Sequence, residues 1–319
     1  MLKKLERDVV AADLSAVEAL LADRTVDEDP SGVFQLTARR DELREALAQL
    51  NESHDLHAAM AVYFGGGPVQ GSRGINADFA GGALEDIQEL VRKRLSNVEI
   101  GPLAAKGPVR LSNNSQLLVT NVARGSFGFI LEEAGNDAPV IETALKLVVD
   151  DVANLIHGIA TTDQQEFVET AANLDGRILI SLKQFFKRLS ENDATMRVVE
   201  GDREFLLDRA AVDRARQRTE AIVIDERPTQ FDGTLYLLPE SRRFELHTNI
   251  DGEGTVIRGP VEREVLRQLS GQADLNQQPI DPREIPRSPW RVLVRVREIR
   301  EQGREPRWAY SLAKLVQRR

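Results

Sequence analysis

Residues 61–75, AVYFGGGPVQGSRGI, place a glycine-rich segment directly after a short apolar run. A P-loop has the pattern GxxxxGK[ST] and leads at once into a helix whose N–H groups bind phosphate. Gly66 and Gly71 have that spacing. However, Ser72 and Arg73 stand where the lysine and the hydroxyl residue belong, and helical periodicity starts only several residues later. The segment therefore favours a hairpin turn, with glycine supplying positive φ, over a phosphate-binding or dinucleotide-binding loop.

The sequence around this segment mixes strand-like and helical patterns. Residues 115–133 contain two β-rich runs, and residues 195–208 form a hairpin pattern about Gly201. Amphipathic helices are expected at 77–95, with Asp78 as a plausible N-cap, and at 139–160, 161–174, 177–191 and 210–221. In the third of these, Asp163 and Glu166 have the spacing of a capping box. Mixed elements of this kind predict a central α+β domain over residues 57–220.

The N-terminal residues 1–56 predict a helical hairpin. Apolar residues recur every three or four positions in two series that flank a Pro- and Gly-containing segment at 27–32. The series are Leu2, Leu5, Val9, Leu14, Val17, Leu20 and Leu21, then Leu43, Leu47 and Leu50. The resulting apolar stripe must be covered, either within the chain or by a second copy in a homodimer.

The C-terminal residues 221–319 have the element order β-β-β-α-β-β. Strands are expected at 231–238, 241–248, 254–259, 290–299 and 307–316, with a helix at 261–269 before a proline-rich link. This order resembles that of an OB-type five-stranded barrel over residues 222–317, although an SH3-like or other small barrel stays open. The predicted fold class is thus α+β, with an N-terminal helical hairpin, a central domain and a C-terminal small β-barrel.

The amino-acid composition limits the expected cellular location of the protein and the kinds of reactive site that it can contain. The chain has 319 residues and 41% hydrophobic residues, which suffices for real cores. It contains no cysteine, which excludes disulfides, thiolate metal sites and a cysteine nucleophile. No apolar run approaches the length of a membrane span, and no secretory signal pattern opens the chain. A bacterial-type cytoplasmic protein without a membrane partner is the expectation.

Charge is distributed unevenly along the chain. Residues 283–319 carry ten arginines and one lysine against four glutamates, a net charge of +7. The preceding 282 residues carry a net charge of −16. A basic end indicates a polyanionic partner, but attraction between the two parts of the chain or across a dimer explains the asymmetry as well.

Arginines and aromatic residues gather on and around the last two strands. In WRVLVRVREI, residues 290–299, valines alternate with arginines, so that one face is apolar and the other basic. In OB-type barrels the loop between strands four and five, together with strands two and three, binds single strands. The residues predicted to contact nucleic acid are Arg242, Arg243, Arg291, Arg295, Arg297, Arg304, Arg307, Trp308 and Tyr310. Interleaved glutamates that pair with these arginines are the alternative.

Two hairpins each place serine and arginine beside glycine. Ser72 and Arg73 lie in one, and Arg124 and Ser126 in the other. If both fell on one rim, guanidinium and backbone N–H groups would bind an anion there. An enzyme acting on a phosphorylated substrate or nucleotide is therefore an alternative function for the central domain.

The residue patterns of the sequence provide little support for other catalytic or metal sites. The four histidines are not accompanied by further ligands at the spacing that a zinc site requires, so no metal site is predicted. No GxSxG motif surrounds a serine. Glu142 and Lys146 are four apart on an expected helix and are interpreted as a salt-bridge pair. No catalytic residue and no cofactor are assigned.

These patterns favour a non-enzymatic binding or adaptor protein. Its C-terminal barrel is expected to contact single-stranded nucleic acid or a partner protein, and its N-terminal helices to self-associate. A further alternative, an acidic inhibitor or antitoxin-like protein of a basic partner, rests on the net charge of −9 alone.

Overall fold

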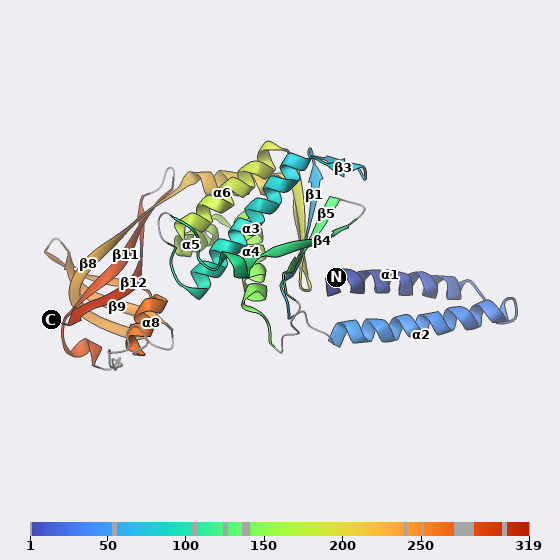
Figure 1. Cartoon of the computed structure of the whole chain (residues 1–319), viewed down its shortest axis with the longest axis horizontal. Coiled ribbons are helices and arrows are strands. Elements are labelled where there is room, and N and C mark those ends of the chain that lie inside the picture. Colours follow the sequence, from blue (N-terminus) through green and yellow to red (C-terminus); the bar gives the residue numbers. More distant parts are fainter. Residues whose placement is uncertain are drawn as a thin grey trace. The chain divides into compact units, whose positions relative to one another are not determined.

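The computed structural model describes residues 2–52, 56–103, 107–123, 127–135, 141–238, 241–250, 252–270, 284–301 and 305–318 (Figure 1). Within these residues the protein is a mixed α+β structure with eight α-helices and antiparallel sheets. Contacts divide the chain into two units. The first contains Met1–Val91, Asn113–Ala160 and Arg188–Val212, and the second contains Arg92–Ser112, Thr161–Lys187 and Asp213–Arg319. Among the described residues, no helix has an apolar stretch long enough to cross a lipid bilayer.

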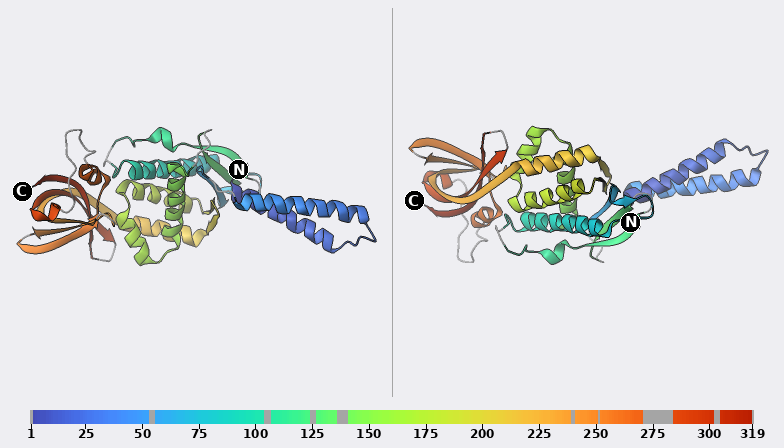
Figure 2. Two further views of the ribbon diagram at one scale, coloured as in Figure 1. Left: turned by 90° about the horizontal axis from the view of Figure 1, so that it is seen from below. Right: turned by 90° about the horizontal axis from the view of Figure 1, so that it is seen from above.

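The N-terminal hairpin is present as predicted. Helices α1 (Lys3–Ala22) and α2 (Pro30–Glu52) run side by side in opposite directions (Figure 2). An ion pair of 2.7 Å between Arg44 and Glu18 joins them. Within α1, whose residues are all described, no side chain is fully buried. The two helices alone therefore leave their apolar seam half exposed to water.

The first unit is built on a five-stranded antiparallel sheet with strand order β4-β5-β1-β6-β7. The strands are β1 (Ala59–Gly66), β4 (Leu117–Ala123), β5 (Phe127–Glu133), β6 (Ala194–Glu200) and β7 (Arg203–Leu207). Helix α3 (Ala77–Glu99) connects β1 to β4, and α4 (Ala144–Thr161) follows β5. The sequence correctly predicted the β4–β5 and β6–β7 hairpins. The order β4-β5-β1-β6 is that of a split β-α-β arrangement, with β7 added at one edge.

The two faces of this sheet have different coverings. The register places Met60, Val62 and Phe64 on one face, where the Phe64 ring meets Phe79 of α3 edge-on at 5.2 Å. Helix α4 covers the same face, because Lys146 of α4 bonds Glu200, the register partner of Met60. On the opposite face Ala61 and Tyr63 pack with Leu2 and Leu5, together with Ile130 and Val199. The N-terminus is thereby anchored to the sheet.

The glycine-rich segment is a turn, but the sequence-based expectation that residues 58–64 and 68–72 pair across it as a hairpin was wrong. Strand β1 pairs with β5 and β6, whereas β2 (Val69–Gln70) pairs with β3 (Gly74–Ile75). Gly66 has φ +77°, and a Cβ there would lie 2.2 Å from the backbone oxygen of Asp193. Glycine is thus needed for positive φ and for the close approach to the loop before β6. That tertiary contact is not visible in the local sequence.

The N-caps predicted for two helices can be compared with those in the structure. Asp163 caps α5 (Gln164–Asn173) by accepting a hydrogen bond of 2.9 Å from the Glu166 N–H, as predicted. The prediction of Asp78 as the N-cap of α3 was wrong. Asn76 accepts from the Phe79 N–H at 2.9 Å and occupies the cap, whereas Asp78 lies in the first turn. Asn and Asp are equally good caps, so the sequence alone did not discriminate between them.

The second unit contains α5, most of α6 (Gly176–Glu191) and α7 (Arg209–Ala221), and the C-terminal sheet. That sheet has the order β10-β9-β8-β11-β12. Its strands are β8 (Ile222–Leu238), β9 (Arg243–Ile250), β10 (Glu253–Pro260), β11 (Trp290–Glu301) and β12 (Arg307–Arg318), with α8 (Arg263–Leu269) between the third and the fourth. The predicted element order is confirmed. Strand β8 starts at Ile222 rather than near Phe231, because it pairs with β11 along its first twelve residues.

The C-terminal sheet curls into a half-barrel (Figures 1 and 2). Its two edge strands approach at one place, a parallel bridge between Val261 and Leu312. The glycine Gly259 permits this approach, since a Cβ there would lie 1.8 Å from the Tyr310 backbone oxygen. Inside lies an apolar core that includes Phe244, Leu246, Val292, Val294 and Leu312. The valine alternation of 290–299 is confirmed as the inward face of β11.

Candidate functional site

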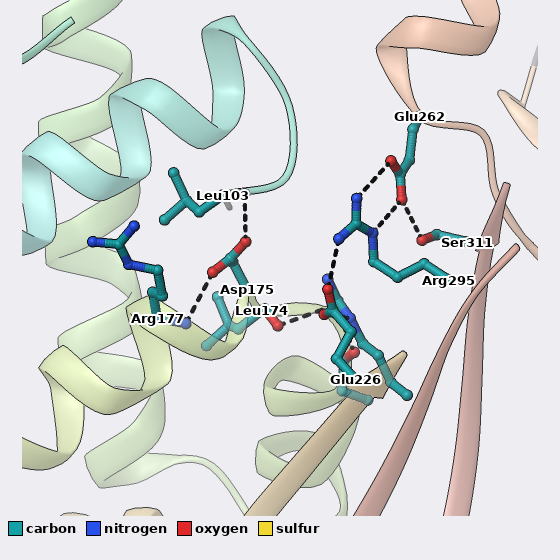
Figure 3. A network of polar contacts seen from close by, with 10 residues as sticks. Leu103, Leu174, Asp175, Arg177, Glu226, Glu262, Arg295 and Ser311 are labelled. Atoms are coloured by element: carbon teal, nitrogen blue, oxygen red, sulfur yellow. Dashed lines mark hydrogen bonds and ion pairs between the residues drawn. The ribbon is translucent and has the colours of Figure 1, made fainter. Parts of the chain in front are cut away.

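The arginines of β11 form an ion-pair network in the second unit (Figure 3). Arg295 donates to Glu226 at 2.7 Å and to Glu262 at 3.0 Å. Arg297 donates to the other oxygen of Glu226 at 2.7 Å and to the Leu174 carbonyl at 3.1 Å. Both arginine side chains are largely buried, with exposed fractions of 24% and 11%. A nucleic acid would have to break these bonds to reach them.

The pKa of Arg295 reflects this environment. Burial alone would lower it, but the hydrogen bonds and charges of Glu262 and Glu226 outweigh burial and raise it above its ordinary value. The Arg295 guanidinium thus stays positively charged between the side chains of Glu226 and Glu262. The acids that neutralise these arginines are not the interleaved glutamates of the local sequence, because Glu298 pairs with Arg300.

The other predicted nucleic-acid residues lie in different parts of the half-barrel. Arg291 pairs with Asp232 at 2.9 Å on the surface. Arg242 and Arg243 lie in the turn before β9 and at its start, and both are exposed. Arg304 lies outside the described residues. Within the part of the chain that the structure describes, neither Arg242 nor Arg243 makes an ion pair, so both keep charge for a ligand.

The start of β12 has the most suitable chemistry for stacking. Trp308 is 46% exposed, and the guanidinium carbon of Arg227 lies 5.9 Å from its ring centroid. Arg307 precedes it and is exposed. Tyr310, two residues further, lines a cavity of about 200 Å³ together with Arg297, Ser311 and residues of neighbouring elements. An exposed tryptophan beside two arginines presents an aromatic face with positive charge around it.

An aromatic pair on the outer surface of β8 and β9 was not expected from the sequence. Tyr236 is 40% exposed, and its ring centroid lies 5.1 Å from that of His247. The two residues do not stand opposite each other, because Tyr236 pairs with Glu245 and His247 with Thr234. Strand register, which the sequence leaves open, creates this diagonal contact.

The predicted anion-binding residues are only partly described. Ser72 and Arg73 are exposed in the turn between β2 and β3, and Arg73 lines an open, polar cavity of about 570 Å³ with Glu191, Asn192 and Asp193. Arg124 and Ser126 lie outside the described residues. The register pairs Phe127, the first residue of β5, with Phe64 near the end of β1. The described end of β5 and the glycine-rich segment thus lie at the same end of the sheet.

A second cluster of charged groups joins α4 to β6 in the first unit. The Lys146 ammonium donates to Asp150 at 2.6 Å and to Glu200 at 2.9 Å. Arg203 donates to the other oxygen of Glu200 and to the Asn154 side chain at 2.6 Å. Glu200 is only 1% exposed. Lys146, Asp150, Glu200 and Arg203 line a polar cavity of about 290 Å³, to which α1 adds Lys3 and Arg7.

The two carboxyl groups of this cluster differ in acidity. Burial, reinforced by the hydrogen bond that protonated Asp150 donates to Glu200, raises the pKa of Asp150 to about 7. Burial would also raise the pKa of Glu200, but its hydrogen bonds with Asp150 and Lys146 outweigh burial and lower it. Lys146 stays charged, because the same two acids outweigh the lowering of its pKa by burial. Asp150 is thus half protonated near neutral pH.

The sequence pattern predicted a different partner for Lys146. The interpretation was a pair with Glu142, but Glu142 precedes α4, and no ion pair involves it among the described residues. The Lys146–Asp150 spacing of four residues was available as a signal. No such signal indicated Glu200, which lies 54 residues away in the sequence. The hydrophobic periodicity of a helix does not predict which strand a given turn of that helix will face.

The histidines and carboxylates offer no metal centre in the described chain. His57 is 41% exposed and lies 3.6 Å from Glu133, and His54 is outside the described residues. Among the residues that the structure describes, no group of three or more His, Cys, Asp or Glu side chains is arranged to hold a metal ion.

The chain matches no protein-family model, no curated protein and no solved structure.

Proposed function

We propose that the protein is a non-enzymatic binding protein whose C-terminal half-barrel binds single-stranded nucleic acid. The observation that carries this proposal is the exposed Trp308, with Arg227 within 5.9 Å of its ring and Arg307 beside it. Proteins that bind single strands combine aromatic stacking of bases with positive charge along the backbone. Arg242 and Arg243 extend the positive charge at the start of β9.

The half-barrel is further proposed to be OB-like. The strand order β10-β9-β8-β11-β12 and the parallel bridge between Val261 and Leu312 support this assignment. In OB-type barrels the loop between strands four and five borders the binding surface, and Trp308 follows that loop here. The face of strands two and three contributes as well, and His247 of the Tyr236–His247 pair lies on strand two here.

The test measures binding of a fluorescein-labelled oligothymidylate by fluorescence anisotropy. Loss of one stacked base costs about 1–3 kcal/mol, so Trp308→Ala should weaken binding about 5- to 150-fold. Trp308→Phe retains a stacking face and should restore most of the affinity. Val316→Ala, an exposed apolar residue on the same strand, is the matched control and should change little. Equal affinities for Trp308→Ala and Val316→Ala would exclude this surface.

Salt dependence supplies a second measure of the same surface. Each phosphate contact contributes about −0.7 to the slope of log affinity against log salt for a single strand. Arg227→Gln combined with Arg307→Gln removes two such contacts and should therefore make the slope shallower by about 1.4. Arg295 and Arg297 are unsuitable for this test, since replacing them breaks the network with Glu226 and alters stability.

A second candidate function is an enzyme that acts on a phosphorylated substrate or nucleotide in the first unit. The observation in its favour is the cavity that holds Asp150, Glu200, Lys146 and Arg203. A carboxyl group with a pKa of about 7 is suited to exchange a proton at neutral pH. A nucleotide or phosphate ester should then raise the melting temperature, and Arg203→Gln should abolish the rise. A screen in which no such compound stabilises the protein contradicts this candidate.

The proposal includes self-association through α1 and α2. Val9 of α1 and Phe34 of α2 are 61% and 76% exposed. A second hairpin packed against this surface would complete a four-helix bundle and bury these side chains.

A further inference from the structure

The second unit contains an apolar cavity that the sequence did not predict. Its volume is about 400 Å³, within the range of small-molecule sites. The start of α6 and the start of β8 supply most of its lining. The apolar lining residues are Leu103, Leu179, Ile180, Ile222, Val223 and Ile224.

Two of these side chains are exposed to an unusual degree. Ile180 is 55% exposed and Val223 is 58% exposed, whereas Leu179 and Ile222 beneath them are each 5% exposed. The cavity therefore has buried apolar side chains at its base and apolar side chains exposed to water at its rim. An apolar ligand seated there would remove Ile180 and Val223 from water, which is favourable.

The two carboxylates that line the cavity are already neutralised or hydrogen-bonded within the protein. Asp175 accepts from the N–H groups of Leu103 at 2.8 Å and Arg177 at 2.9 Å (Figure 3). Glu226 is bonded by Arg295 and Arg297. Glu226 is therefore paired with positive charge, and both oxygens of Asp175 accept hydrogen bonds before any ligand binds.

A positive charge is available at the same cavity. Lys183 lies three residues after Ile180 on α6, lines the cavity and is exposed. In the described part of the chain the Lys183 ammonium makes no hydrogen bond or ion pair. Arg177 lines the cavity as well and adds to the positive potential. The site is thus apolar at its base and cationic at its rim.

We propose that this cavity binds a small amphiphile with a hydrocarbon body and a carboxylate head group. The hydrocarbon covers Ile180 and Val223, and the carboxylate pairs with Lys183. This inference is independent of nucleic-acid binding, because none of the residues at Trp308 lines the cavity.

The experiment is isothermal titration calorimetry of the full chain with decanoate, below the concentration at which it forms micelles. Saturable binding with one decanoate per chain is expected. Lys183→Glu should weaken it at least tenfold, because a favourable charge contact becomes a repulsive one. Lys187→Glu is the matched control, since Lys187 is exposed one turn further along α6 and does not line the cavity, and it should change affinity less than twofold. Val223→Ser should weaken binding through the hydrocarbon.

The head group is tested with 1-decanol, which has the same chain without the charge. It should bind at least tenfold more weakly than decanoate to the unmodified protein, and equally to the unmodified protein and Lys183→Glu. The proposal is overturned if decanoate shows no saturable binding. It is also overturned if the two lysine variants bind decanoate alike, or if decanol binds as tightly as decanoate.

Discussion

Asp150 shows how one carboxyl group depends on neighbours that are distant in sequence. Its hydrogen bond to Lys146 lies within one helix, four residues apart. Its unusual pKa comes from burial and from Glu200 on strand β6. Two carboxyl groups beside one ammonium cannot both ionise without cost, so one of them retains a proton near neutral pH.

The stability of the protein should consequently depend on pH between about 5 and 8. The pKa of Asp150 is raised in the folded state, so its contribution is fully present below the unfolded value of about 3.9 and is lost as pH rises through about 7. Glu200, with a lowered pKa, contributes in the opposite direction, losing stability only as pH falls below about 4.3. The free energy of unfolding should therefore fall from pH 5.5 to pH 8, by less than the roughly 1.4 kcal/mol per pH unit of one fully linked proton.

Asp150→Asn tests this expectation, because an amide imitates the protonated carboxyl group. Urea denaturation at pH 5.5 and pH 8 should give nearly equal stabilities for the variant and unequal ones for the unmodified protein. Asp151→Asn, the adjacent residue on α4, is the control and should retain the dependence. A variant whose stability falls with pH as steeply as that of the unmodified protein would assign the titration to another group.

At the scale of the element, β11 separates what a strand pattern predicts from what it leaves open. Alternation placed Val292, Val294 and Val296 in the core, and all three are buried. The same alternation placed Arg295 and Arg297 on the other face but did not say what covers that face. The covering groups are Glu226 of β8, Glu262 before α8, and backbone carbonyls at the end of α5.

The two kinds of arginine on β11 should differ in their effect on stability. Arg295→Met leaves Glu226 and Glu262 without this partner in a partly buried site, which should cost about 2–4 kcal/mol. Arg291→Met removes a surface pair with Asp232 and should cost at most about 1 kcal/mol. Urea denaturation midpoints measure both. Equal losses for the two variants would mean that the network contributes no more than a surface pair.

At the scale of the whole molecule, the N-terminal hairpin bears on the oligomeric state. In α1, Val9 and Leu20 are exposed and no side chain is fully buried, whereas Leu43 of α2 is buried. Two helices cannot enclose each other's apolar residues, so a third or fourth helix is needed for a closed core. A second copy of the hairpin supplies two such helices by symmetry.

The proposed self-association predicts a dimer in size-exclusion chromatography with light scattering. Val9→Glu combined with Leu20→Glu adds charge to the exposed apolar side of α1 and should give a monomer. Ala11→Glu combined with Ala22→Glu adds the same charge on another side of α1 and should leave the dimer intact. A monomeric unmodified protein, or a dimer that persists with glutamates at 9 and 20, contradicts the proposal.

The sequence by itself determined the element types and their order. Helical periodicity gave the hairpin, strand alternation gave the inward face of β11, and the Asp163 cap set the start of α5, because these signals act within a few residues. The tertiary structure alone decided that β1 pairs with β5 and β6, and that Gly66 meets the backbone of Asp193. It also placed Glu200 beside Lys146 and Glu226 beside Arg295. Such contacts join residues that are far apart along the chain, and their energies depend on burial and register, which no local pattern contains.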